Sequence, residues 1–172
     1  MMKNLFKFTI ILLLVIVNSV QAQVKPTTAA ERLNGIQKRK LLEKDTTLNS
    51  IKFRNVGPGI MSGRVVDVDV NPNDPTEFYV AYATGGLWYT KNNGQSLVPV
   101  FDKENVFGIG DIAVNWKDGI IWIGTGEANS SRSSYAGTGM YRSADGGKTW
   151  EQRGLSESHH IARIILHPSD PN

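Results

Sequence analysis

The stretch YRSADGGKTW, residues 141–150, places small polar residues and two glycines between an apolar residue and a tryptophan. Asp145 can accept backbone N–H hydrogen bonds across a tight turn, and the two glycines after it supply the positive φ that such a turn needs. Hydroxyls on either side brace the flanking strands, while the tryptophan ring packs beneath them. The stretch predicts a β-hairpin that stabilises the fold, although such a turn can also hold an ion or contact a partner. The residues given this structural role are Ser143, Asp145, Gly147, Thr149 and Trp150.

A second copy of this pattern lies upstream in TKNNGQSL, residues 90–97. Its Thr90, Asn92, Gly94 and Ser96 fall in register with the polar and glycine positions of the first copy, and Leu97 replaces the tryptophan. Asparagine keeps the side-chain acceptor without the charge. We therefore expect a second hairpin of the same type.

The surrounding sequence repeats as well. DVDVNPNDP from Asp67 recurs as DIAVNWKDG from Asp111 and as RIILHPSDP from Arg163, at intervals of 44 and 52 residues. The additional length of the second interval falls in residues 127–138. Each repeat contains short runs rich in Val, Ile, Tyr and Trp, separated by Gly, Asn, Asp and Pro. This composition is typical of short antiparallel strands.

Each repeat predicts four strands, and four-stranded units of this length are the blades of a β-propeller. The fold class expected is all-β, with blade one at about 64–101, blade two at about 109–153 and the start of blade three in 160–172. Two blades and a strand cannot close a ring, so we expect the chain to be the beginning of a longer protein. The strands expected are Arg64–Val70, Glu77–Ala83, Leu87–Thr90, Ser96–Phe101, Ile109–Asn115, Ile120–Gly124, Gly139–Arg142 and Thr149–Arg153.

The N-terminal residues have the features of an export signal. Lys3 and Lys7 precede an apolar run, and Val20 and Ala22 occupy the small-residue positions of a cleavage site. We expect residues 1–22 to be a signal peptide and the mature protein to be secreted, periplasmic or on the cell surface, with no stable membrane span. The alternative is a membrane anchor, for which the apolar run is short.

Residues 23–52 are polar and resemble a linker that contains one short helix. Thr28 and Glu31 form a capping-box pattern ahead of apolar residues. The propeller is expected to occupy residues 53–172.

Charge and composition exclude several classes of function. Residues 1–53 hold nine Lys and Arg against three Asp and Glu, whereas residues 54–172 hold ten against thirteen. The predicted propeller is therefore slightly acidic, and no nucleic-acid partner is expected. The chain has no cysteine. His159 and His160 are adjacent and would point to opposite faces of a strand, so we expect no metal site, and no cofactor motif is present.

The stretch SADGGKTW resembles the Asp-box, also called the bacterial neuraminidase repeat, of sialidases, sortilin-type propellers and xyloglucan-active glycosidases. The wider pattern includes FRNVGPGIMSGRVVDVDVNP, ATGGLWYTKNNGQS, IWIGTGE and HPSDPN. It is similar to the start of large exported bacterial proteins described as sortilin-like or glycosyl-hydrolase-like. The resemblance covers residues 53–172. It implies the propeller fold, but related propellers include both enzymes and binding proteins.

Two departures from these families bear on activity. The resemblance to xyloglucan-active enzymes implies an Asp immediately before the xGG element of the first blade, where this chain has Ala83. Sialidases use an arginine cluster to hold the substrate carboxylate. Arg54 and Arg64 precede the first inner strand, but no complete triad is visible.

Strand direction divides the connections between two faces. The turns between first and second strands and between third and fourth strands share one face, which includes the Asp-box hairpins. The other connections gather on the opposite face, where loops on a rigid scaffold usually carry binding groups. Those connections are expected at 57–63, 84–86, 107–110, 127–138 and 156–160.

Candidate catalytic residues follow from the chemistry of glycoside hydrolysis, which needs two carboxyl groups roughly 5–9.5 Å apart. The carboxylates considered are Glu127, Asp111 and Asp67, and the candidate ligand-binding residues are Arg64, Arg132 and Tyr135. Each has an alternative: the two aspartates and Arg163 also fit a channel lining, Glu127 also fits an exposed loop charge, and Arg64 also fits an ion pair with Asp67 or a loop carboxylate.

The leading functional hypothesis is a secreted sortilin-like Asp-box propeller that binds peptide, protein or glycan on the face opposite its Asp-box turns. The alternative is a glycoside hydrolase acting on polysaccharide, with part of its active site in later blades. A third possibility is a structural segment of a multidomain surface protein, with neither ligand nor activity.

Overall fold

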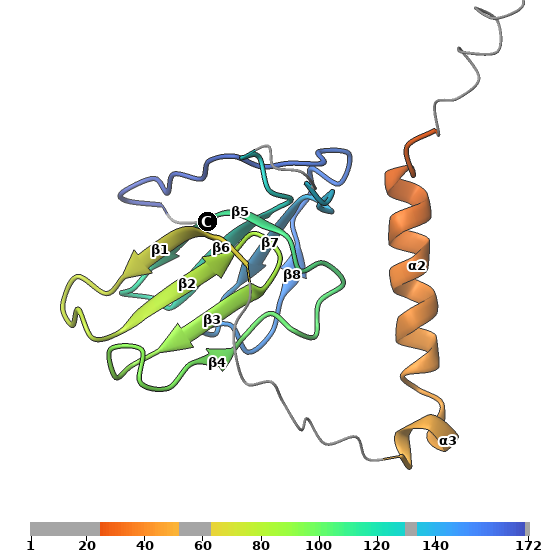
Figure 1. Cartoon of the computed structure of the whole chain (residues 1–172), viewed down its shortest axis with the longest axis horizontal. Helices are drawn as coiled ribbons and strands as arrows, with labels where there is room; N and C mark the ends of the chain where they lie inside the picture. Colours follow the sequence, from red (N-terminus) through yellow and green to blue (C-terminus); the bar gives the residue numbers. More distant parts are fainter. Residues whose placement is uncertain (1–24, 52–62, 130–133, 171–172) are drawn as a thin grey trace, which may run out of the picture.

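The computed structural model describes residues 25–51, 63–129 and 134–170. These contain two four-stranded antiparallel sheets, each with its strands in sequence order (Figure 1). The first sheet consists of β1 (Val65–Val70), β2 (Phe78–Tyr82), β3 (Gly86–Thr90) and β4 (Val98–Pro99), and the second of β5 (Ile109–Asn115), β6 (Ile120–Thr125), β7 (Met140–Ser143) and β8 (Glu151–Gln152). The predicted all-β class is confirmed, and the two sheets are two blades of a β-propeller.

The fourth strand of each blade is shorter than predicted. In blade one the polar turn continues to Ser96, so β4 begins only at Val98; after Pro99, the N–H of Val100 still donates to the carbonyl of Leu87 at 2.9 Å. In blade two, Arg153 donates to the carbonyl of Met140 at 2.7 Å, and the N–H of Met140 donates to the carbonyl of Gly154 at 3.0 Å, where φ is 91°. Each outer strand therefore has two residues in regular pairing, and irregular backbone hydrogen bonds continue the contact beyond them.

The strand predicted to open a third blade is not paired in a sheet. Residues 161–166 form no ladder, and the bridge found in this segment joins His167 to Asp170. A strand needs a neighbour for its backbone groups, and the described residues after β8 include no second strand that could pair with it. The segment instead contacts blade two, where Ile161 donates to the carbonyl of Gly126 at 3.3 Å.

The core lies between the two blades. Strand alternation places Tyr79 and Ala81 of β2 on the same apolar cluster as Ile112, Ile121 and Ile123 of blade two. All five side chains are less than one-tenth exposed. Burying a large aliphatic side chain stabilises a fold by about 1.5–3 kcal/mol, so this contact supplies much of the stability of the pair.

Aromatic rings extend the core toward the outer strands. Phe101, at the end of blade one, packs edge-on against Tyr141 and Trp150 of blade two, with ring centroids 5.3 and 5.0 Å away. The indole N–H of Trp150 donates to the carbonyl of Val100 at 2.8 Å. The tryptophan therefore joins the two blades as well as supporting its own hairpin.

Two helices precede the sheets, α2 (Ala29–Leu42) and α3 (Thr46–Asn49). The capping box at the start of α2 is present: the N–H of Thr28 donates to Glu31, at 2.9 Å, and the N–H of Glu31 donates to the Thr28 hydroxyl, at 3.3 Å. These bonds satisfy backbone donors that a helix start leaves unpaired. Neither described helix has the length and apolar character that crossing a membrane requires. The predicted signal peptide lies outside the described residues.

Candidate functional site

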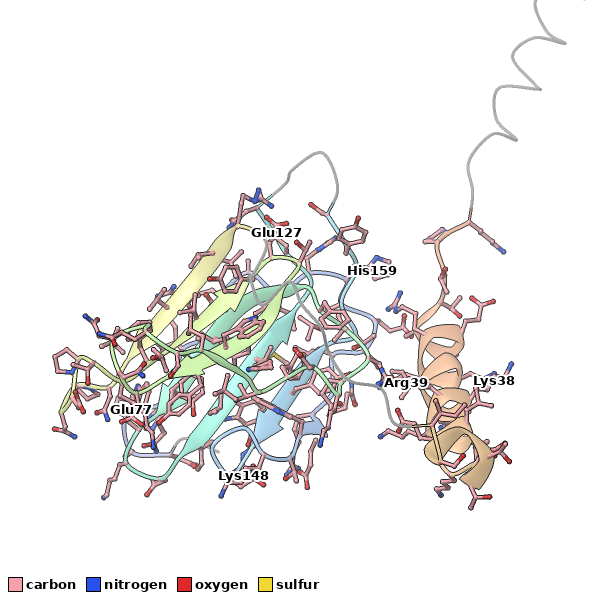
Figure 2. The ribbon with its side chains drawn as sticks, turned by 60° about the horizontal axis from the view of Figure 1, so that its bottom comes forward. Lys38, Arg39, Glu77, Glu127, Lys148 and His159 are labelled. Carbon is pink, nitrogen blue, oxygen red and sulfur yellow. The ribbon has the colours of Figure 1, made fainter. Side chains whose placement is uncertain are left out.

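The two faces predicted from strand direction lie at opposite ends of the blades. Figure 2 shows Glu127 and His159 at one end and Glu77 and Lys148 at the other. We call the first end the loop face, formed by residues 84–86, 104–110, 125–129, 134–139 and 155–160. We call the second end the hairpin face, formed by residues 71–77, 91–97, 116–119 and 144–150.

On the hairpin face, the side chain of Asp145 organises its turn. One carboxylate oxygen accepts from the Ser143 hydroxyl at 2.8 Å and from the N–H groups of Lys148 and Thr149 at 3.0 and 2.9 Å. The other accepts from the Thr149 hydroxyl at 2.7 Å. The hydrogen bonds from Thr149 are the main cause that lowers the pKa of Asp145 to about 2. Asp145 is therefore charged at neutral pH, and its carboxylate stabilises the hairpin through these hydrogen bonds.

Blade one contains the same turn with an amide in place of the carboxylate. Asn92 accepts from the Thr90 hydroxyl and from the N–H of Ser96, both at 2.9 Å, and its own NH₂ donates to the Ser96 hydroxyl at 2.8 Å. The N–H of Gly94 donates to the Thr90 hydroxyl at 3.0 Å. The two hairpins use equivalent contacts, which support a structural role for this residue set.

Two aspartates of β1, the inner strand of blade one, accept hydrogen bonds from β5, the inner strand of blade two, and from the residue that follows it. Asp67 accepts from the N–H of Ile112 at 3.2 Å, and Asp69 accepts from the N–H of Val114 at 2.8 Å and from the indole N–H of Trp116 at 2.6 Å. Each of these hydrogen bonds joins a donor in blade two to an acceptor in blade one. The candidate catalytic residue Asp67 therefore has a structural contact in the inner wall.

Asp111 repeats this contact one blade further along. It accepts from the N–H of Ile164 at 2.5 Å, while Arg163 lies 3.7 Å away and is largely exposed. Burial raises the pKa of Asp111; the N–H of Ile164 opposes the rise, and the neighbouring Asp67 carboxylate adds to it. Burial also raises the pKa of Asp69, opposed by its bonds from Trp116 and Val114. The inner wall thus brings Asp67 and Asp111 close together.

On the loop face, Glu127 is buried, with an exposed fraction of 1%. The alternative of an exposed loop charge is therefore wrong. Arg64, from the start of blade one, forms an ion pair with the Oε1 atom of Glu127. This contact confirms the alternative in which Arg64 pairs with a loop carboxylate. The second oxygen, Oε2, is buried without a hydrogen-bond partner in residues 25–51, 63–129 and 134–170.

Glycines allow the chain to pass closely around Glu127. Gly126 has φ of 82° and donates to the carbonyl of Gly108 at 2.8 Å. A Cβ atom at this glycine would collide with the carbonyl oxygen of His159, and one at Gly137 would collide with Thr125. The N–H of Gly137 donates to the same His159 carbonyl at 2.7 Å. Close backbone contacts therefore fix the position of the glutamate.

A groove of about 430 Å³ opens on the loop face. It is lined by Thr84, Asn105, Val106, Phe107, Gly108, Tyr135 and Ala136. Tyr135 and Phe107 are 60% and 55% exposed, so two aromatic rings reach solvent at one groove. Phe107 was not among the residues predicted for the site. The sequence feature that could have identified Phe107 is an aromatic residue next to a glycine, in the connection from the fourth strand of blade one to the first strand of blade two.

Two residues singled out in the sequence, Ala83 and Arg132, remain to be placed. Ala83 is buried, with an exposed fraction of 2%, and leaves no carboxylate at the position where xyloglucan-active enzymes were expected to have one. Arg132 lies outside the described residues. In the described segments, no group of three or more His, Asp or Glu side chains is placed to hold a metal ion.

Comparison with solved structures supports the fold. The chain matches an ancestral GH74 enzyme at 24% identity with a TM-score of 0.51, over 69% of this chain and 14% of that one. It matches GH74 of Niastella koreensis at 19% identity and a TM-score of 0.48, over 60% of this chain and 16% of that one. It matches the GH74 xyloglucanase of Xanthomonas campestris at 18% identity and a TM-score of 0.37, over 49% and 14%.

The likeness to the ancestral GH74 enzyme supports the β-propeller fold alone. The chain spans only about one-seventh of the length of the ancestral enzyme. No family model matches the sequence, and a search of curated proteins finds no match.

Proposed function

We propose that the loop face of this propeller binds a glycan. The observation that carries the proposal is the groove in which Tyr135 and Phe107 both expose their rings. An aromatic ring offers a flat apolar surface against which the C–H face of a sugar can pack, and binding grooves combine such surfaces with a few polar groups. Thr84 and Asn105 in the same lining supply a hydroxyl and an amide that can bond sugar hydroxyls.

The charge near the groove favours a neutral glycan over an acidic one. Arg64 is paired with the buried Glu127, so its positive charge is already balanced. A site built for sialic acid or a uronic acid needs an arginine whose charge is available to the ligand carboxylate. Neutral hydroxyls, by contrast, can accept hydrogen bonds from the remaining N–H groups of Arg64, whose side chain is half-exposed.

The likeness to GH74 enzymes selects the first probe, because one of them is described as a xyloglucanase. Xyloglucan oligosaccharides would be titrated into the full-length protein by calorimetry. Tyr135→Ala and Phe107→Ala should each weaken binding about tenfold, and Tyr135→Phe should retain it because the ring remains. Arg132→Ala tests the candidate that lies outside the described residues.

The matched control is Val98→Ala, which removes a similarly exposed apolar side chain from an outer strand. It should bind as the parent protein does. Unchanged affinity in both aromatic variants would reject the groove. Binding of peptides or proteins, the other ligands of the sortilin-like hypothesis, forms a separate arm with a peptide library, and a peptide-only result would reject the glycan proposal.

Export and the Asp-box classification belong to the same proposal. The pattern of residues 1–22 and the hairpin contacts of Asp145 and Asn92 support them. Mass spectrometry of the mature N-terminus should find a chain that begins at Gln23. Recovery of an uncleaved chain from the cytoplasm would reject export.

A second candidate function is glycoside hydrolysis. The inner wall places Asp67 beside Asp111, and burial raises the pKa of Asp111, as it does for a carboxyl group that acts as a general acid. Release of reducing ends from xyloglucan by the complete protein, abolished by Asp111→Asn or Glu127→Gln in variants that stay folded, would support this function. Full activity in both variants would exclude these two residues.

A further inference from the structure

Helix α2 is held against the loop face by two arginines. Arg32 donates to the carbonyl of Ser156 at 2.8 Å and lies 3.0 Å from the Nε2 atom of His159. Arg39 lies two turns further along the same side of the helix and contacts the connection between β4 and β5. Its partners are the carbonyl of Glu104, at 3.4 Å, and the amide oxygen of Asn105, at 3.3 Å. Figure 2 shows Arg39 directed toward the sheets and Lys38 directed away from them.

The rest of this contact is sparse. Ala29 is buried, but Leu41 and Leu42 at the other end of α2 are 66% and 60% exposed. A hollow of about 350 Å³ remains between the helix and the blades, lined on the helix side by Arg32, Gly35, Ile36 and Arg39. Because little apolar surface is buried there, the arginine contacts provide much of the attachment. Such a helix can detach while the core between the blades stays intact.

The attached helix borders the proposed glycan groove. The hollow under α2 and the groove beside Tyr135 share three lining residues, Asn105, Val106 and Ala136. A glycan chain that leaves the groove in this direction therefore meets the helix. Asn105, one of the polar groups available to a sugar, is already in contact with Arg39.

We propose that α2 is a detachable autoinhibitory strap, which Arg32 and Arg39 hold across part of the loop face and which limits access of the glycan to the groove. The competition between α2 and the glycan rests on the proposed function, whereas the attachment of α2 to the blades does not. If α2 is attached in about nine molecules of ten, its release raises the apparent affinity for the glycan about tenfold, because the competent fraction rises from about one-tenth to one.

The test compares the full-length protein with Arg32→Ala/Arg39→Ala. The control is Lys38→Ala/Lys44→Ala, which removes two positive charges from exposed positions of the same region. Hydrogen exchange of the α2 amides is the first measurement. An isolated helix of this length is marginal in water, so exchange should become faster in the arginine variant, by up to about tenfold for the same attached fraction, and stay unchanged in the lysine control. Equal protection in all three proteins would overturn the attachment.

Affinity for the xyloglucan oligosaccharide is the second measurement. The arginine variant should bind about tenfold more tightly than the parent, and the lysine control should match the parent. Faster exchange without tighter binding would overturn the autoinhibition. If no protein of the three binds any glycan, the proposed function and the competition both fail, and the exchange result still decides whether α2 is attached. Near-UV circular dichroism of the tryptophans verifies that the blades remain folded in each variant.

Discussion

Asp69 joins the two blades, and its replacement should reveal how much that contact stabilises the fold. Asp69→Ala removes the acceptor for the N–H of Val114, at 2.8 Å, and for the indole N–H of Trp116, at 2.6 Å. Each buried donor left without an acceptor costs about 1–3 kcal/mol. Because the site is only partly buried, water can replace some of the lost bonding, and we expect a total cost of about 2–4 kcal/mol.

Urea and thermal denaturation of the full-length protein measure this cost. The melting temperature should fall by about 10 °C, given about 4 °C for each kcal/mol in a domain of this size. Asp69→Asn keeps one acceptor and should lose about half as much. The control Asp74→Ala removes an exposed carboxylate that accepts from Thr76 within its own turn, and it should have a smaller effect because water replaces those bonds. A parent-like stability of Asp69→Ala, within about 0.5 kcal/mol, would refute the role of this contact.

Three further results are expected. Asp145→Ala should lower the free energy of unfolding by about 1–2 kcal/mol in urea titrations, and Asp145→Asn by much less, because Asn92 already performs this role in blade one. The pKa of Asp145 is lowered to about 2, so the stability that its charged form contributes is present above pH 4 and is lost as the pH falls from about 4 to about 2. The free energy of unfolding, measured against pH, should show this loss of stability in the parent and not in Asp145→Asn. Gly126→Ala should cost about 2 kcal/mol or more by urea denaturation, whereas Gly146→Ala, which also has positive φ but nothing within 4 Å of its added Cβ, should cost only about 1 kcal/mol; equal costs would show that the crowding around Glu127 is unimportant.

Local sequence patterns predicted the strands well because alternation and turn chemistry act over a few residues. Ile109–Asn115 has the bounds expected from its pattern. The outer strands were overestimated because apolar residues such as Val100 and Phe101 continue past Pro99, the last residue of β4. The capping box of α2 is likewise a contact within four residues, and it was visible in the sequence.

Contacts between distant residues could not be read in the same way. The bond from Val114 to Asp69 joins positions 45 residues apart, so alternation placed the aspartate on a face without naming its partner. Glu127 was expected at a loop mouth, but its burial depends on Arg64 from the other blade and on the tight passage at Gly126. The attachment of α2 through Arg32 has no local signal at all.

The most direct test of the glycan surface is a map of amide chemical shifts in the full-length protein as xyloglucan oligosaccharide is added. Binding in the groove should change the shifts at Thr84, Phe107, Gly108 and Tyr135 and leave those of the hairpins around Gly94 and Gly146 unchanged. Changes confined to the hairpins would contradict it.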